Sequence, residues 1–307
     1  MGQVFSVILP LILLVTVGFF AAKSRLLSKQ DWHGIERLSF TILIPALIIN
    51  AIYQSDLSLK TSGPYVLAVV LAIACIGLLA LLLRILLPQS ALPATQLSSM
   101  FQAVTRWNAL ITLPIGAQLF GADGLATIAI AMAFLIPIIN IGNIIVISGL
   151  HADNFDIGQV AKSIAKNPLI IACAIGLAMN YAQIHPPKAA ADALQMISRS
   201  ALAIGLLCIG AGFDWRRLLQ PGWPVIWGVV VKNIAAPVLF MGLAKWFGLG
   251  QIETLCGMLV VATPAATNGY IVARQMGGDA ELYAYIMSWQ LVVSVLTFPA
   301  MIYLMQG

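Results

Sequence analysis

Two short stretches decide the fold: residues 105–116, which read TRWNALITLPIG, and residues 262–269, which read ATPAATNG. Each lies in the middle of a long apolar run, where an ordinary membrane-spanning helix carries Leu or Val. Proline removes a backbone donor and clashes with the preceding helical turn, so breaks are expected in both stretches. The predicted break positions are Pro114, Gly116, Pro264 and Gly269. Irregular backbone at membrane depth is tolerated only inside protein or around a cavity, so these breaks indicate a functional site.

The composition around these stretches excludes a water-soluble protein. Of the 307 residues, 61% are hydrophobic and only 9% are charged, whereas a soluble domain carries about 25% charged residues. The basic residues that give the net charge of +5 are scattered at segment ends, so no nucleic-acid partner is expected. The four cysteines lie inside apolar runs without metal-ligand or redox spacing, so neither a metal nor a cofactor is expected.

Ten apolar runs have about the 20-residue length that a membrane-spanning helix needs. They predict an all-α integral membrane protein with ten transmembrane helices. The runs are 3–22, 34–54, 64–87, 96–119, 124–149, 167–184, 189–212, 222–246, 252–275 and 280–305. Lys23 and Arg25 follow the first run, an order that favours an uncleaved helix over a signal peptide. Basic residues concentrate in the odd-numbered connections, which predicts that both termini lie outside the cytoplasm.

Two matching motifs indicate an internal repeat. Residues 121–124 (GADG) separate the fourth and fifth runs, and residues 277–280 (GGDA), 156 positions later, separate the ninth and tenth. Because each half holds an odd number of runs, the halves must have opposite orientations in the membrane. Inverted repeats of this kind are typical of alternating-access transporters. We therefore predict two five-helix repeats, 1–153 and 154–307, with the broken fourth and ninth helices crossing.

Three basic residues, Arg106, Arg199 and Lys232, fall near the middles of apolar runs, and no acidic residue lies at a comparable depth. A central charge costs about 2.5–3.5 kcal/mol, so its default interpretation is functional. Fixed cations without buried anions favour an anionic ligand. Structural alternatives remain open: Arg106 can cap a broken helix, Lys232 can bond freed backbone carbonyls, and Arg199 can pair with Asp192.

The predicted binding site therefore combines cations with hydrogen-bond donors of the two broken segments. Its members are Arg106, Asn108, Thr112, Lys232, Thr263, Thr267 and Asn268. An enzyme is not expected: residues 277–279 (GGD) are superficially similar to an aspartyl intramembrane protease motif, but no second buried Asp accompanies them. A receptor or a structural protein would not explain paired breaks at mid-span.

Four motifs, in order along ten predicted helices, carry a resemblance to a known family. They are residues 37–46 (RLSFTILIPA), 106–108 (RWN) through 119–121 (LFG), Lys232 followed by Pro237, and 264–273 followed by GGD. On these motifs the chain resembles the auxin efflux carrier family, which includes plant auxin exporters and bacterial carriers for malate or malonate. The chain lacks the large central hydrophilic loop of the plant exporters, so a bacterial-type carrier of the cytoplasmic (inner) membrane is expected.

The resemblance implies a fold similar to sodium/proton antiporters and bile-acid-type carriers. It implies a scaffold (1–55 plus 160–213), a transport domain (60–150 plus 220–307), an elevator motion and a homodimer formed through scaffold helices. It further implies that the substrate carboxylate is held at the crossover by Asn108 and by the backbone near Ala109 and Ala265. Pro264 completes the set of predicted substrate-binding residues.

Together these arguments predict a secondary transporter that moves a small organic anion across the membrane. The expected partners are this anion and the membrane lipid around the protein. The alternative is a sodium- or proton-coupled symporter of the same fold, whose cation site would be built from Asn, Thr and backbone carbonyls.

Overall fold

The structure is a computed structural model that describes residues 2–54, 59–151, 158, 161–162, 165–212, 221–266 and 268–306. All regular structure in these ranges is helical. Six of the described helices are long and apolar enough to cross a membrane. They are Gln30–Tyr53, Ser62–Leu86, Asp123–His151, Lys188–Cys208, Trp223–Phe247 and Ala280–Leu304. The chain is therefore an all-α integral membrane protein, as its composition predicted.

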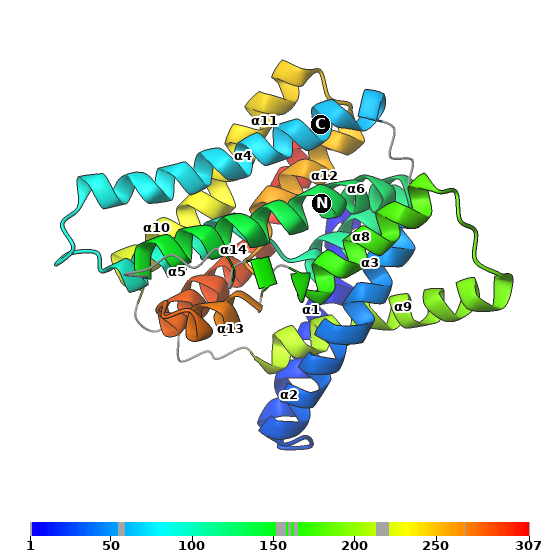
Figure 1. The fold of residues 1–307 in the computed structure, drawn as a ribbon, viewed down its shortest axis with the longest axis horizontal. Coiled ribbons are helices and arrows are strands. Elements are labelled where there is room, and N and C mark those ends of the chain that lie inside the picture. The colour runs from blue at the N-terminus through cyan, green and yellow to red at the C-terminus, as the bar shows by residue number, and fades with distance from the viewer. Residues whose placement is uncertain are drawn as a thin grey trace. The chain divides into compact units, whose positions relative to one another are not determined.

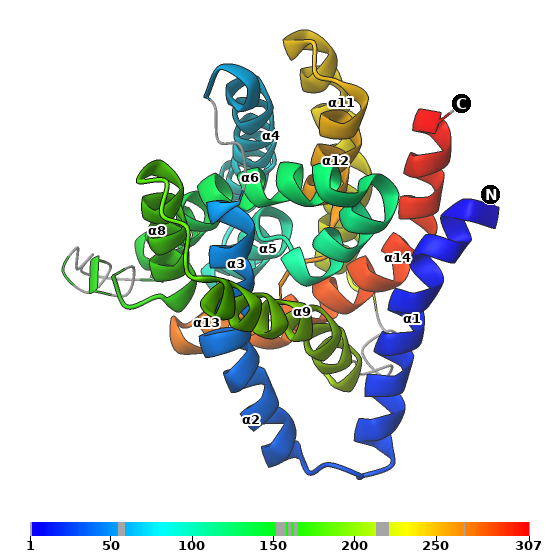
Figure 2. The same ribbon diagram turned by 90° about the vertical axis from the view of Figure 1, so that its right-hand side faces the viewer.

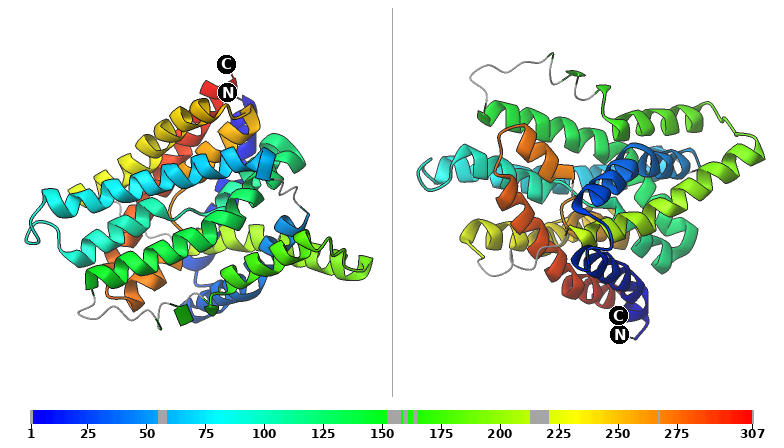
Figure 3. Two further views of the ribbon diagram at one scale, coloured as in Figure 1. Left: turned by 45° about the horizontal axis from the view of Figure 1, so that its top comes forward. Right: turned by 90° about the horizontal axis from the view of Figure 1, so that it is seen from below.

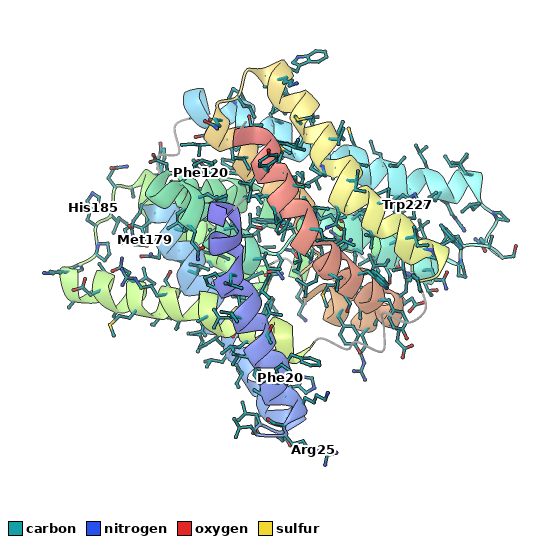
Figure 4. All side chains as sticks on the ribbon, turned by 180° about the vertical axis from the view of Figure 1, so that it is seen from behind. Phe20, Arg25, Phe120, Met179, His185 and Trp227 are labelled. Carbon is teal, nitrogen blue, oxygen red and sulfur yellow. The ribbon has the colours of Figure 1, made fainter. Side chains whose placement is uncertain are left out.

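The chain forms two compact units. The first comprises Met1–Ser62, Leu110–Pro137 and Ser163–Phe213. Its helices are α1 (Gly2–Lys23), α2 (Lys29–Leu38), the π-helical turn η1 (Ser39–Leu43), α3 (Ile44–Tyr53), the first part of α6 (Ala109–His151), α8 (Pro168–Tyr181) and α9 (Lys188–Ala211). Figure 2 shows α1 and α2 joined as a helical hairpin, and Figure 4 marks Arg25 at the turn between them.

Small residues bring the backbones of α1 and α9 into contact within this first unit. A Cβ atom on Gly18 would lie 2.1 Å from the carbonyl oxygen of Leu207, and one on Gly210 would lie 1.8 Å from that of Val15. Glycine pairs of this kind are the usual means of close helix packing in membranes, where burial of apolar surface supplies no driving force.

A sharp turn at Gly121 divides helix α6. Gly121 has φ 57° and ψ −133°, a conformation that side chains with a Cβ rarely adopt. Beyond the turn, Gly124 lies so close to Gly116 that a Cβ on Gly124 would meet the Gly116 carbonyl oxygen at 2.2 Å. The two arms of α6 in the first unit therefore pack as a tight hairpin, and its turn coincides with the GADG motif.

The second unit comprises Gly63–Ala109, Ile138–Lys162 and Asp214–Gly307. Its helices are α4 (Leu59–Leu86), α5 (Ala94–Thr105), the end of α6, α10 (Trp223–Val230), the π-helical turn η3 (Val231–Ala235), α11 (Ala236–Phe247), α12 (Gln251–Ala262), α13 (Asn268–Gln275) and α14 (Ala280–Gln306). Helix α14 packs against α5, α10 and α12 (Figure 1). Figure 3 shows the short α13 leading through a turn into α14.

The core of the second unit is formed where α5, α10 and α14 meet. Its largest fully buried members include Tyr283, Leu97 and Met100. Trp227, labelled on α10 in Figure 4, is partly buried and packs against this cluster. The interrupted segments described below lie against this core, because Ala265 is one of its members.

Proline explains the π-helical turn η3. Pro237 has no N–H group to donate to the carbonyl of Asn233, so the α-helical bonding pattern cannot continue there. The N–H of Ala236 donates instead to Val231, five residues earlier. The same arrangement precedes Pro45, where Ile44 donates to Ser39. The wider turn η3 carries the buried Lys232, and π-helical turns are frequent at functional sites.

Candidate functional site

Two helices of the second unit are interrupted. Helix α5 ends at Thr105, residues 106–108 are not helical, and α6 begins at Ala109. Helix α12 ends at Ala262, residues 263–266 are not helical, and α13 begins at Asn268. Arg106 (φ −73°, ψ 151°) and Thr263 (φ −58°, ψ 138°) turn the backbone out of the helix at the two ends. Both interruptions fall within the stretches that the sequence singled out.

The first interruption does not occur at the predicted residues. Pro114 and Gly116 both lie within helix α6, and the backbone leaves the helix earlier, at Arg106. A proline removes only one backbone donor, and membrane helices tolerate this when neighbouring groups satisfy the freed carbonyl. In the ninth segment Pro264 does lie in the interruption, whereas Gly269 belongs to the first turn of α13.

Arg106 is the buried cation of the first interruption, with only 3% of its surface exposed. Its Nε donates to Oε1 of Gln102 at 3.1 Å, and its Nη1 donates to Oδ1 of Asn140 at 3.1 Å. Its Nη2 is buried and has no hydrogen-bond partner among the described residues. In the same ranges the one ion pair is that of His33 with Glu36. Among the described residues no carboxylate neutralises this buried guanidinium, which favours an anionic ligand.

Gly269 brings the second interruption against Arg106. A Cβ on Gly269 would lie 2.8 Å from Cδ of Arg106 and 2.1 Å from the hydroxyl oxygen of Tyr283. The Tyr283 hydroxyl donates to the carbonyl oxygen of Ala266 at 2.5 Å. Glycine is therefore required at position 269 by close contact and not by a helix break.

The ammonium group of Lys232 contacts the last turn of α5. This residue is fully buried in η3, and its Nζ donates to the carbonyl oxygen of Val104 at 3.1 Å. Bonding to backbone carbonyls was the structural alternative that the sequence left open for Lys232, and it is the arrangement found. The carbonyls in the last turn of a helix have no partner within the helix, so a buried ammonium there satisfies both groups.

Sequence reasoning missed Gln290 of α14. Its Nε2 donates to the carbonyl oxygens of Ala103 at 3.1 Å and Gly228 at 3.2 Å, and its Oε1 accepts from the N–H of Ala265 at 2.9 Å. The backbone donor of Ala265, which the resemblance assigned to a substrate carboxylate, is therefore engaged within the protein. A glutamine in the middle of an apolar run is the sequence signal by which this position could have been found.

Other predicted residues lie near the interruptions in varied settings. Asn108 is buried directly before α6, and Ala109, half-buried, begins that helix. Thr263 is buried, and its hydroxyl donates to the carbonyl of Leu259 in its own helix. The backbone of Asn268 begins α13, while its side chain and the whole of Thr267 lie outside the described residues.

Two predicted candidates belong to the first compact unit. Thr112 is buried there. Arg199 is exposed on α9, and the predicted pair with Asp192 is not among the ion pairs of the described residues.

Asparagines of α6 support the first interruption. Asn140 accepts from Arg106, as described above, and Nδ2 of Asn143 donates to Oγ1 of Thr105 at 3.2 Å and to the carbonyl of Ile139 at 2.8 Å. These bonds connect the end of α5 to the second half of α6.

A helical membrane protein whose interrupted segments enclose a buried cation has the features of a transporter, because such segments line the binding sites of many carriers. Residues 156–302 match the family described as Membrane transport protein. A protein of Rhizobium meliloti (strain 1021), named "Putative malonate transporter", is 23% identical over 149 residues. That alignment covers 48% of this chain and 47% of the relative, so the chain spans about half the length of the curated relative it matches.

These similarities support the family that the motifs indicated. They point to a transporter of the auxin efflux carrier type rather than to an enzyme.

Proposed function

We propose that the chain is a secondary transporter of a small organic anion and that Arg106 binds the substrate carboxylate. The carrying observation is the buried guanidinium with a free Nη2 and no carboxylate partner among the described residues. Burial of an unpaired charge is costly, so a site of this kind is retained when a counter-charge arrives with the ligand. A guanidinium also presents two parallel donors that match a carboxylate.

The substrate class receives support from two independent directions. The guanidinium selects for an anion by its charge, and the relative from Rhizobium meliloti carries malonate in its name. We therefore propose small carboxylates, with malonate as the first compound to test. Asn108, Ala109 and the first turn of α13 are the proposed neighbours of the anion, since they flank Arg106 in sequence or in space.

The proposed mechanism is elevator-type alternating access by ten helices in two inverted five-helix repeats. Gly121 and Gly277, which occupy equivalent positions of the two motifs, both have positive φ angles of 57° and 83°. The interruptions at 106–108 and 263–266 also lie close to the same 156-residue offset. The boundary between the proposed repeats, 153/154, falls outside the described residues.

The two compact units correspond only in part to the proposed scaffold and transport domain. The first unit holds 1–62 and 163–213 but also 110–137, which belong to the proposed transport domain, and the second holds 63–109, 138–162 and 214–307. We further propose a homodimer through scaffold helices, in the cytoplasmic membrane, with both termini outside.

The cation-coupled alternative needs free backbone carbonyls. The carbonyls of Ala103 and Val104 at the end of α5 already accept from Gln290 and Lys232. A sodium site at this helix end would therefore have to displace two buried donors, which makes the anion carrier the better-supported function.

Uptake into proteoliposomes tests the proposal. Purified protein should take up labelled malonate or a related carboxylate, with and without a sodium gradient. Arg106→Ala should reduce uptake at least about tenfold, because the charge that attracts the anion is lost. Arg199→Ala, which removes an exposed arginine, is the matched control and should leave uptake unchanged. Equal uptake by Arg106→Ala and the wild type contradicts the proposed role, and uptake that requires sodium supports the alternative.

A further inference from the structure

We propose that Gln290 is a positioning residue that fixes both interrupted segments, and with them the substrate-binding guanidinium, on helix α14. The inference rests on the proposed function for its effect on transport, but its structural part is testable without any substrate. Gln290 is fully buried in the middle of α14 and has no predicted contact with the substrate.

One side chain joins three elements. The two N–H groups of Gln290 donate to Ala103 in the last turn of α5 and to Gly228 in α10, and its oxygen accepts from Ala265 in the second interruption. Because both donors and the acceptor are used, the amide is held in one orientation. A buried polar group satisfied in this way contributes to a unique arrangement of the segments around it.

A second residue of α14 holds the neighbouring peptide group. Tyr283 lies seven residues before Gln290, about two helical turns along the same face. Its hydroxyl donates to Ala266, directly after the residue held by Gln290. In a continuous helix these backbone groups would bond to residues four positions away. Helix α14 thus supplies side-chain partners for the N–H of Ala265 and the carbonyl of Ala266.

This arrangement determines where Arg106 lies. The carbonyls of Ala103 and Val104 in the last turn of α5 accept from Gln290 and Lys232, and Arg106 lies two residues after Val104. From the other side, Tyr283 and Gly269 pack against Arg106. Contacts from helix α14 to both interruptions therefore fix the position of the Arg106 guanidinium. Groups that position a substrate must be held this precisely.

Only an amide side chain fills this role. A carboxylate accepts from Ala265 but cannot donate to two carbonyls, and an aliphatic side chain does neither. Gln290→Leu therefore removes all three bonds, and Gln290→Glu keeps the acceptor for Ala265. Tyr283→Phe removes only the hydroxyl and keeps the ring against Gly269. Ser294→Ala is the matched control, because the Ser294 hydroxyl is also buried on α14 but bonds only to Leu291 of its own helix.

The test combines hydrogen exchange with transport kinetics on the purified full chain. In Gln290→Leu, peptides that cover residues 263–266 should exchange about tenfold faster, since the Ala265 amide loses its acceptor. Gln290→Glu should restore most of that protection, and Ser294→Ala should match the wild type. For malonate uptake, Gln290→Leu and Tyr283→Phe should raise KM about tenfold and leave the maximal rate nearly unchanged. A purely structural role would lower the amount of folded protein and the maximal rate with an unchanged KM.

The outcomes separate the two proposals. Unchanged exchange at residues 263–266 in both Gln290→Leu and Tyr283→Phe overturns the positioning role, whatever the transport result. An unchanged KM in folded variants whose segment does exchange faster also overturns it. A further outcome is that the wild type neither transports nor binds any carboxylate while hydrogen exchange becomes faster in Gln290→Leu as expected. In that outcome the proposed function fails, and the role of Gln290 in fixing the interrupted segment stands.

Discussion

Gly269→Ala tests the closest contact of the candidate site. The added Cβ would lie 2.1 Å from the hydroxyl oxygen of Tyr283, 2.3 Å from its Cζ, and 2.8 Å from Cδ of Arg106. Real Cβ atoms do not approach other atoms this closely, so the tyrosine ring, the arginine or the first turn of α13 must move. Overpacking a buried site costs about 1–3 kcal/mol. Because Tyr283 also bonds to Ala266, the movement reaches both interruptions.

The expected result is a lower unfolding temperature together with weaker carboxylate uptake. A matched control is Gly242→Ala in α11, where an added Cβ meets nothing within 4 Å. That substitution should be neutral or stabilising by up to about 1 kcal/mol, because alanine favours helix over glycine. Thermal unfolding in detergent measures both variants. The reasoning is refuted if Gly269→Ala and Gly242→Ala have the same stability and the same uptake.

Three further predictions concern other parts of the second unit and the hairpin of α6. Lys232→Met keeps the length of the side chain but leaves the Val104 carbonyl unsatisfied, so unfolding should be easier by about 1–3 kcal/mol; unchanged stability in a denaturation assay would oppose this. Asn140→Ala removes the acceptor of Arg106 Nη1 and should raise the KM for malonate severalfold, which uptake kinetics measure. Gly121→Ala meets no steric contact but must adopt φ 57° with ψ −133°, so it should cost about 1–3 kcal/mol in thermal unfolding.

Much of the helical architecture was predictable because membrane helices are long and apolar. The runs read from the sequence lie on helices of the structure, and the two polar stretches contain the interruptions. Local sequence is sufficient to predict these helices, because an apolar run of about 20 residues has few stable conformations in lipid other than a helix. The GADG motif likewise pointed to the turn at Gly121, where only glycine adopts the required φ without strain.

The position of the first interruption was not predictable from Pro114. A proline signals a missing donor, but whether the helix breaks depends on which partners surround the freed carbonyl. The break at Arg106 depends on Gln102 and Asn140, which accept from the guanidinium, and Asn140 lies 34 residues away. Such long-range partners leave no periodic pattern in the sequence.

Gln290 and Tyr283 were missed for a similar reason. Their bonds go to residues in α5, α10 and the second interruption, so their importance appears only once these segments are brought together. A polar residue in the middle of an apolar segment was a signal in both the Lys232 and Gln290 cases. Because only charged residues at mid-span were considered, Lys232 was predicted and Gln290 was missed.

The most direct test of the central claim is the stabilisation of the purified protein by malonate. A ligand that binds the folded state stabilises it by about 2.7 kcal/mol at a concentration 100 times its Kd. The wild type and Arg199→Ala should therefore show rising unfolding temperatures as malonate is added, without sodium. Arg106→Ala should show no rise, and Arg106→Lys should show a smaller one because the paired donors are lost. Equal stabilisation of Arg106→Ala and the wild type would contradict the placement of the anion at Arg106.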